Sequence, residues 1–203
     1  MAITSEEALV DAVKDAAGSI SVQGGGTRGL PATGQVVSVA GLQGITLYEP
    51  GALTLVAKPG TPVAEIEEAL AAENQRLAFE PMDHRGLLGT TGTPTIGGVM
   101  AGNISGPRRI SVGAARDFLL GVRFVDGRGA VVKNGGRVMK NVTGYDLVKL
   151  MAGSFGTLGV LSEVSMKVLP RPETQATLVL HGLEDAAAVA AMARALGSPF
   201  EVT

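Results

Sequence analysis

Residues 19–29 read Ser-Ile-Ser-Val-Gln-Gly-Gly-Gly-Thr-Arg-Gly, a short apolar stretch that runs directly into a glycine-rich turn. The alternation of Ile20 and Val22 with polar residues predicts a β-strand that ends at Gln23. Consecutive glycines permit positive φ angles and leave no Cβ over the backbone, so neutral N–H donors can converge on an anion. The segment therefore predicts a strand followed by a loop that either binds an anion or only turns the chain.

The spacing Gly24-x-Gly26-x-x-Gly29 also matches the fingerprint of dinucleotide-binding Rossmann folds, and Glu49 lies near the position of a ribose-binding acid. In a Rossmann site, however, the glycines open a helix whose N-terminus holds the pyrophosphate. Residues 30–34, Leu-Pro-Ala-Thr-Gly, do not have the pattern of a long helix. The sequence therefore disfavours a Rossmann fold.

Two further glycine-rich segments follow, over residues 95–106 and 153–160. The first reads Thr-Ile-Gly-Gly-Val-Met-Ala-Gly-Asn-Ile-Ser-Gly, and the second reads Gly-Ser-Phe-Gly-Thr-Leu-Gly-Val. Small residues at every second or third position let a backbone lie close to a ligand or to another backbone. Three such segments are typical of one long ligand that crosses several strand ends, and close packing within the protein is the alternative.

The rest of the chain predicts helices and strands around these clusters. A capping box of Thr4 and Glu7 precedes apolar residues at helical spacing, and Thr61 is the expected cap of a second helix with Pro62 in its first turn. Residues 126–129, Asp-Gly-Arg-Gly, lie between two apolar runs and predict a hairpin. We expect strands over residues 35–40, 53–58, 120–125, 130–133, 158–169 and 176–180, and helices over 4–16, 61–70, 145–151 and 183–196, whereas residues 79–109 lack periodicity.

Composition narrows the class of protein. With 45% hydrophobic and 18% charged residues in a chain of 203, the protein is globular, and its formal net charge of −2 argues against nucleic-acid binding. No apolar run is long enough for a transmembrane segment. The absence of Cys excludes disulfides and thiolate-held metals in this chain, and His84 and His181 have no ligand-spaced partners, so we expect no metal site.

Taken in order and spacing, the motifs resemble a known family. Residues 23–27, 59–60, 95–98, 105–109 and 153–160 are similar to the FAD-binding domain of the vanillyl-alcohol oxidase and p-cresol methylhydroxylase type. Residues 116–118, 138–147 and 161–172 look closest to the glycolate oxidase branch of that family, in its FAD-binding subunit. One departure is Phe155, which stands where the family usually has an acid.

The resemblance implies an α+β fold with two α/β lobes and FAD between them. It divides the chain into an N-terminal lobe over residues 1–55 with the pyrophosphate loop, a second FAD-binding lobe over residues 56–170, and the start of an incomplete C-terminal substrate or cap domain over residues 171–203. A β-α arm docked on the main domain is the alternative for the last segment. Because the chain has no Cys, and no His near the pyrophosphate loop, we expect FAD to be bound non-covalently.

The resemblance also implies a set of cofactor contacts. We expect the pyrophosphate to lie at the loop over residues 23–29, the ribityl chain and isoalloxazine ring beside residues 81–83 and 95–106, and the adenine near residues 159–160. The expected contacts are Gln23, Gly24, Gly25, Gly26, Thr27, Arg28, Gly29, Pro81, Met82, Asp83, Thr95, Gly97, Gly98, Ala101, Gly102, Asn103, Ser105, Gly106, Gly159 and Val160. His84 either faces the substrate or is a solvated loop residue, and no catalytic residue is assigned.

The function implied by the resemblance is that of an FAD-binding subunit of an oxidoreductase complex acting on a 2-hydroxy acid such as glycolate or D-lactate. Its partners would be a second flavin subunit and an iron–sulfur subunit, in the cytoplasm or at the inner membrane through those subunits. Two alternatives stay open. The chain either holds FAD for electron relay or assembly without its own catalysis, or it is a flavin-dependent reductase of nucleotide sugars.

Overall fold

The computed structural model describes residues 3–136, 144–199 and 202. Residues 138–143 of the glycolate-oxidase-like segment lie outside the described residues. The helices are α1 (Glu6–Lys14), α2 (Val63–Ala72), α3 (Arg85–Leu88), α4 (Ile96–Ala101), α5 (Arg109–Val112), α6 (Ala115–Phe118), α7 (Leu147–Met151) and α8 (Asp185–Leu196), with a 3-10 turn η1 (Pro50–Ala52). The strands are β1 (Ile20–Gln23), β2 (Gln35–Ser38), β3 (Ile45–Glu49), β4 (Thr54–Ala57), β5 (Gln75–Arg76), β6 (Leu119–Val125), β7 (Val131–Gly135), β8 (Val160–Lys167) and β9 (Leu169–Pro170).

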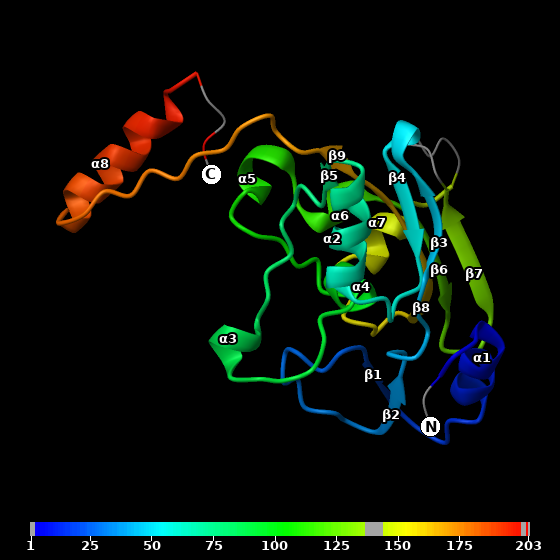
Figure 1. Ribbon diagram of the computed structural model, residues 1–203. Helices are drawn as coiled ribbons and strands as arrows, with labels where there is room; N and C mark the ends of the chain where they lie inside the picture. The colour runs from blue at the N-terminus through cyan, green and yellow to red at the C-terminus, as the bar shows by residue number, and fades with distance from the viewer. Residues whose placement is uncertain (1–2, 137–143, 200–201, 203) are drawn as a thin grey trace.

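The largest sheet has five antiparallel strands in the order β3-β4-β8-β6-β7 (Figure 1). Its central strand β8 and its neighbour β4 are almost fully buried, and α4, α6 and α7 contact the sheet. The core on this side contains Leu55, Ile66, Met100 and Met166, together with Phe79 and its ring partner Phe118. The hairpin β6-β7 forms at residues 126–129, as the sequence predicts, because the Asp126 carboxylate accepts from the N–H groups of Arg128 and Ala130.

A smaller unit packs at one end of this sheet. It consists of α1 and the parallel pair β1-β2, and its core contains Leu9, Val13 and Val37. Val125 of β6 and Val160 of β8 belong to this second core, while the middle residues of the same strands belong to the first. The two cores are therefore joined through β6 and β8.

An ion pair reinforces that junction. Glu6 of α1 accepts hydrogen bonds from Arg123 Nε of β6 at 2.6 Å and from Ser162 Oγ of β8 at 2.7 Å. These two elements are far from α1 in the sequence, so the contact fastens the N-terminal helix to the sheet. The Arg123 hydrogen bond lowers the pKa of Glu6 below its ordinary value.

Several expected elements differ in detail. Helix α1 is capped by Ser5, whose Oγ accepts from the N–H of Ala8 at 3.1 Å, and not by Thr4. Thr61 does not cap α2, since its hydroxyl donates to the Lys58 carbonyl instead. Strand β3 was not expected. It pairs with β4 in the large sheet, so residue 55, where the sequence analysis divides the two lobes, lies inside a sheet strand. The lobe division itself stays a prediction.

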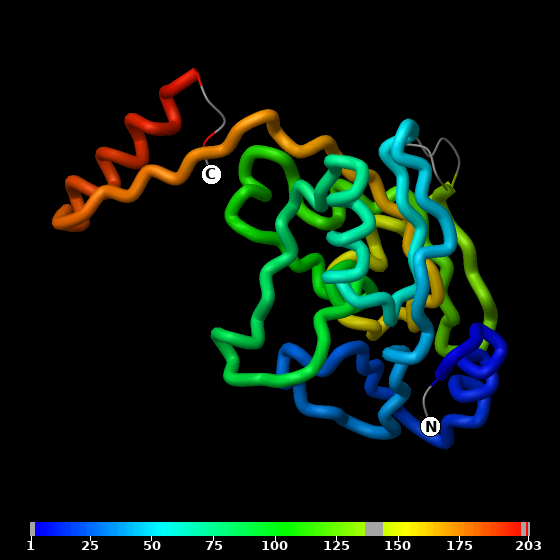
Figure 2. The backbone as a smooth tube through the Cα atoms, in the orientation of Figure 1, coloured from blue at the N-terminus to red at the C-terminus, as the bar shows by residue number. Residues whose placement is uncertain are grey.

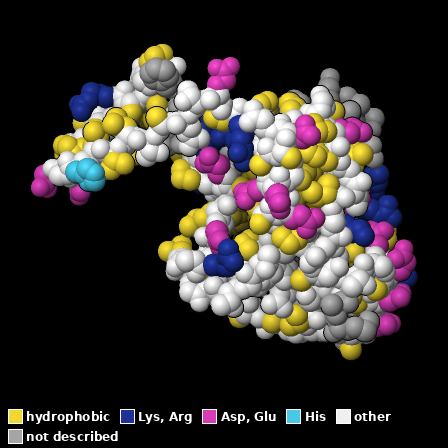
Figure 3. Space-filling model, viewed as in Figure 1, with side chains coloured by type: hydrophobic (Ala, Val, Ile, Leu, Met, Phe, Trp, Pro, Cys, Tyr) yellow, Lys and Arg dark blue, Asp and Glu magenta, His cyan; other side chains and the backbone are white. Residues whose placement is uncertain are grey.

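The C-terminal segment leaves the body of the molecule as an extended arm that ends in α8 (Figures 1 and 2). The strand expected over residues 176–180 does not form, and Leu178 there is 83% exposed. Apolar side chains lie along the arm, where Figure 3 shows them at the surface, and α8 has no buried residue. The expected helix over residues 183–196 is confirmed as α8.

Candidate cofactor-binding site

A cleft of about 400 Å³ lies where the smaller unit meets α4 and the segment before β8. One wall is formed by β1 and the loop that follows it, and the other by α4 with the two segments around residues 82–84 and 155–157. Of the expected cofactor contacts, the cleft brings together Gln23, Gly24, Gly25, Gly26, Thr27, Arg28, Gly29, Met82, Thr95 and Gly98, and His84 also lines it. These residues come from three distant parts of the chain.

The loop over residues 24–29 offers free hydrogen-bond donors to the cleft. The carbonyl of Gln23 at the end of β1 accepts from the N–H of Val39 at 2.9 Å, which is the last backbone bond of the parallel pair. Residues 26–29 form a turn, and none of the N–H groups of residues 24–28 donates to an acceptor among the described residues. Unpaired backbone donors are costly unless water or a ligand satisfies them. Such a run of amides is a natural site for an anion.

The back of the same loop packs against another stretch of backbone. A Cβ on Gly25 would lie 1.6 Å from the Thr93 carbonyl oxygen, and a Cβ on Gly92 would lie 2.0 Å from the Gly25 carbonyl oxygen. The Thr90 hydroxyl also donates to the Thr27 carbonyl at 2.6 Å. The glycine at position 25 is therefore explained by the close approach of two backbone segments, whether or not a ligand is bound.

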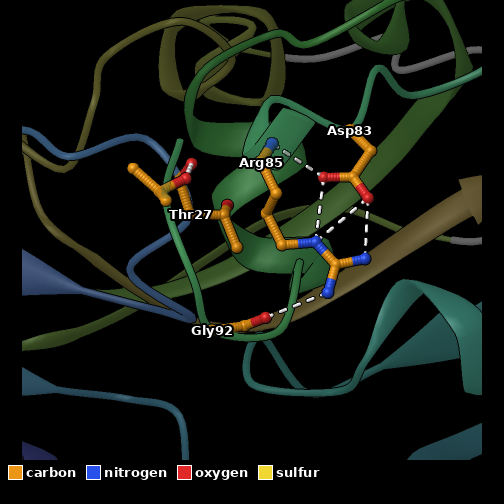
Figure 4. A network of polar contacts seen from close by, with 5 residues as sticks. Thr27, Asp83, Arg85 and Gly92 are labelled. Carbon is orange, nitrogen blue, oxygen red and sulfur yellow. Dashed lines mark hydrogen bonds and ion pairs between the residues drawn. The ribbon is translucent and has the colours of Figure 1, made fainter. Parts of the chain in front are cut away.

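The segment behind the loop is braced by Arg85, as Figure 4 shows. Its guanidinium donates to both carboxylate oxygens of Asp83, with the shortest distance 2.7 Å, and to the carbonyl of Gly92 at 3.2 Å. The hydrogen bonds from Arg85 lower the pKa of the exposed Asp83 to about 2. Asp83 thus braces the loop that supports the cleft, and it is not itself a lining residue.

Arg28 is the one cation in the cleft wall formed by the loop. Its guanidinium donates to the carbonyl of Gly98 in α4, and burial lowers the pKa of Arg28 below its ordinary value. A Cβ on Gly98 would lie 2.9 Å from one guanidinium nitrogen, and a Cβ on Gly102 would lie 3.2 Å from the other. The glycines on this face of α4 therefore make room for Arg28. Within the described residues no carboxylate pairs with this guanidinium, so its charge is available to an anion.

Thr95, the residue before α4, has a hydroxyl without a partner. The residue is only 5% exposed, and its Oγ1 is buried with no hydrogen-bond partner among the described residues. A Cβ on Gly24 would lie 2.6 Å from this oxygen, so the hydroxyl is directly beneath the loop. An unsatisfied buried hydroxyl at such a place is the kind of group that a bound ligand satisfies.

The other expected contacts do not line the cleft. Gly97 and Gly106 face protein backbone, at Pro59 and Glu80, and Gly159 faces the ring of Phe124. Asn103 and Ser105 accept hydrogen bonds from the N–H groups of Arg116 and Ala115. Pro81, Asp83, Ala101 and Gly102 are also absent from the lining, and Val160 lies in the smaller core.

The lining residues missing from the expected contacts include one further group, Phe155, Gly156 and Thr157. They belong to the third glycine cluster, but sequence reasoning assigned the contact to its last two residues. Gly156 approaches β1 closely, since a Cβ there would lie 3.1 Å from Val22 Cβ. The available signal was a large aromatic residue between glycines at 153 and 156.

Comparison with known proteins identifies the class of cofactor-binding protein. A family model for an FAD binding domain matches residues 1–135, which is most of the chain. The protein belongs to this family of FAD-binding domains. A solved structure of alkyldihydroxyacetonephosphate synthase shares the fold, with a TM-score of 0.67 at 21% sequence identity, over 86% of this chain and 32% of that one. The expected α+β fold of the p-cresol methylhydroxylase type is therefore confirmed.

The curated relatives are more specific. The chain is 44% identical over 178 residues to the glycolate oxidase subunit GlcE of Escherichia coli, covering 85% of this chain and 49% of that protein. It is 38% identical over 137 residues to the glycolate oxidase subunit GlcD of Bacillus subtilis, covering 67% of this chain and 28% of that protein. A D-lactate dehydrogenase of Anaerostipes hadrus is 40% identical over 93 residues, covering 45% of this chain and 20% of that protein. The chain thus spans about half the length of the first relative and less of the others.

Proposed function

We propose that this chain is the FAD-binding part of an oxidoreductase that oxidises a small 2-hydroxy acid such as glycolate or D-lactate. The similarity to glycolate oxidase subunits and to a D-lactate dehydrogenase supports the substrate class. Bound FAD supplies an acceptor for the hydride that leaves the 2-carbon of such an acid. The work of this chain is to bind and orient the cofactor.

The observation on which the proposal depends is the donor set of the cleft. The N–H groups of residues 24–28, the guanidinium of Arg28, which pairs with no carboxylate among the described residues, and the buried hydroxyl of Thr95 suit a doubly charged diphosphate. The sequence predicts neutral main-chain donors together with Arg28 at this loop, and the charge of Arg28 complements the ligand. Hydrogen bonds to a charged phosphate are stronger than those between neutral groups. We infer that the pyrophosphate lies between this loop and α4.

The remaining expected contacts stay predictions. We propose that they support the cofactor through main-chain atoms or through the residues that line the cleft. They are Pro81, Asp83, Gly97, Ala101, Gly102, Asn103, Ser105, Gly106, Gly159 and Val160. His84 lines the cleft and is the candidate nearest to a substrate. Non-covalent attachment of FAD is also a prediction.

Partners are proposed from the same relatives. Names that include glycolate oxidase subunits indicate an assembly of several chains, and we propose a second flavin subunit and an iron–sulfur subunit as partners. Across the described residues, no helix has the length and apolar character needed to cross a bilayer. A cytoplasmic location, with contact to the inner membrane through the partners, stays a prediction.

One observation favours a second function, in which the chain holds FAD without oxidising a substrate. Among the described residues that line the cleft, the only ionisable side chains are Arg28 and His84. Removing the hydroxyl proton of a 2-hydroxy acid needs a base or an electrostatic partner. Because His84 is the single candidate for that base among the described lining residues, a role in electron relay or assembly is the alternative function.

The protein purified from its host with its natural partners tests both functions. We expect a flavin absorbance spectrum, with FAD identified by mass spectrometry after release, and bleaching of the flavin on anaerobic addition of glycolate or D-lactate. Bound FAD that no 2-hydroxy acid reduces would favour the relay function. Protein that retains no flavin would refute both.

A further inference from the structure

A second cleft, of about 530 Å³, lies where α2, β5 and the start of the C-terminal arm meet. Four charged residues line it, and they are Glu67, Arg76, Glu80 and Arg171. None of these described residues lines the cofactor cleft. Figure 3 shows charged side chains of both signs close together where the arm leaves the body. Cavities of this size commonly hold a small molecule, so the charges show which kind of molecule this cleft suits.

The guanidinium of Arg76 makes no hydrogen bond with the described residues. The side chain is 17% exposed, and its Nε is buried without a hydrogen-bond partner. Its ion pair with Glu80 is long, because Nη1 and Oε1 lie 3.9 Å apart. The Glu80 carboxylate accepts instead from Arg108 Nε at 2.9 Å. Burying a charged group without hydrogen bonds is costly, so an anion that bonds the Arg76 guanidinium would stabilise this arrangement.

The other charges of the cleft favour a ligand with a single negative charge. Arg108 compensates the charge of Glu80. Burial raises the pKa of Glu67, and the nearby positive charge of Arg171 opposes that rise, so Glu67 and Arg171 act on each other. The charge of Arg76 is then left to match one negative charge. A phosphate group carries more than one negative charge at neutral pH and would be repelled by Glu67, whereas a carboxylate fits the planar edge of a guanidinium with two parallel hydrogen bonds.

We propose that this cleft binds a small monocarboxylic acid with an apolar tail, and that its carboxylate pairs with Arg76. The apolar lining residues Leu77, Pro81 and Pro172 would remove the tail from water. Such a ligand differs from the 2-hydroxy acids of the proposed function, which carry a hydroxyl next to the carboxylate. The inference therefore goes beyond the proposed function and does not depend on FAD.

Isothermal titration calorimetry of the full chain with butyrate, acetate and inorganic phosphate tests the proposal. FAD is added to saturation, so that the cofactor cleft is occupied, and the ionic strength is held constant. Butyrate should bind on the order of tenfold more tightly than acetate, because two further methylene groups leave water. It should also bind more tightly than phosphate. In Arg76→Met the affinity for butyrate should fall by roughly tenfold or more, since a hydrogen bond to a charged group is lost.

Arg128→Met is the matched control, because it removes the same charge from an exposed turn that does not line this cleft. It should leave butyrate binding unchanged. Arg76→Lys keeps the charge without the planar fork and should bind butyrate with intermediate affinity, which separates a lost contact from a misfolded variant. The proposal is wrong if the parent binds no butyrate, if Arg76→Met binds it as tightly as Arg128→Met does, or if phosphate binds more tightly.

Failure of the proposed function leaves this test intact. If the protein binds no FAD, the titrations are repeated in an Arg28→Met background, which removes the cation of the cofactor cleft. Butyrate binding that Arg28→Met keeps and Arg76→Met loses would support the second cleft on its own. Butyrate binding that Arg28→Met loses would place the carboxylate in the cofactor cleft and overturn the proposal.

Discussion

Removing the charge of Arg28 should weaken FAD binding while it leaves the unfolding free energy of the ligand-free protein almost unchanged. In Arg28→Met the unbranched chain keeps much of the packing against α4, while the guanidinium is lost. The Gly98 carbonyl still accepts from the N–H of Gly102 at 3.1 Å, so no buried acceptor is left without a partner. Burial already disfavours the charged form of Arg28, which lowers its pKa, so removing the charge also removes an unfavourable desolvation.

The two expected magnitudes differ. The lost bond to Gly98 costs about 0.5–1.5 kcal/mol, and the relief of desolvation opposes that loss, so the unfolding free energy without ligand should change by less than about 1 kcal/mol. A hydrogen bond to a charged phosphate contributes about 1.5–3 kcal/mol, which corresponds to roughly a 10- to 150-fold rise in the dissociation constant for FAD. The variant should therefore be as stable as the parent and bind FAD much more weakly.

FAD titration followed by flavin fluorescence and denaturant unfolding of the ligand-free protein measure the two quantities. Arg128→Met is the control, since Arg128 lies exposed in the β6-β7 turn, away from the cleft, and its loss changes the net charge equally. FAD affinity that falls no further in Arg28→Met than in Arg128→Met would refute the assignment of Arg28 to the pyrophosphate.

Three further predictions concern the framework. Gly25→Ala should lower the melting temperature and FAD affinity together, because the new Cβ would lie 1.6 Å from the Thr93 carbonyl oxygen, whereas Gly51→Ala has open space and should alter neither. Glu6→Gln should lower the unfolding free energy at pH 7. The hydrogen bond from Arg123 lowers the pKa of Glu6, so the ionised carboxylate stabilises the fold above about pH 4. This stabilisation is lost when the pH falls through the lowered pKa, and the unfolding free energies of the two proteins should converge below that pH. Phe79→Ala should cost about 3–5 kcal/mol in urea unfolding, and a loss below 1 kcal/mol would contradict its place in the core.

Local signals predicted much of the framework. Strand β1, the glycine loop and the β6-β7 hairpin were identified because neighbouring residues determine them. Strand β3 was missed because a register irregularity between Ile45 and Leu47 interrupts its pairing, and the strand is only partly buried. Residues 176–180 have strong β propensity, but a strand also needs a neighbour to pair with, and none of the described strands pairs there.

The site was predicted less completely because it depends on long-range contacts. The loop was identified, yet the pairing of Arg28 with a helix 70 residues later could not be read from spacing. Glycines at 97, 106 and 159 resemble ligand contacts in sequence, although they allow close packing within the protein. That Phe155, Gly156 and Thr157 line the cleft depends on how the turn before β8 meets β1, which periodicity does not encode.

The sharing of β6 and β8 between the two cores has a consequence for how the cofactor enters. Val125 of β6 and Val160 of β8 pack into the smaller core, while neighbouring residues of the same strands pack into the larger one. Moving the two cleft walls apart would therefore expose buried apolar side chains to water, which is costly. We expect FAD to enter with small adjustments of the loops, without a wide separation of the two walls.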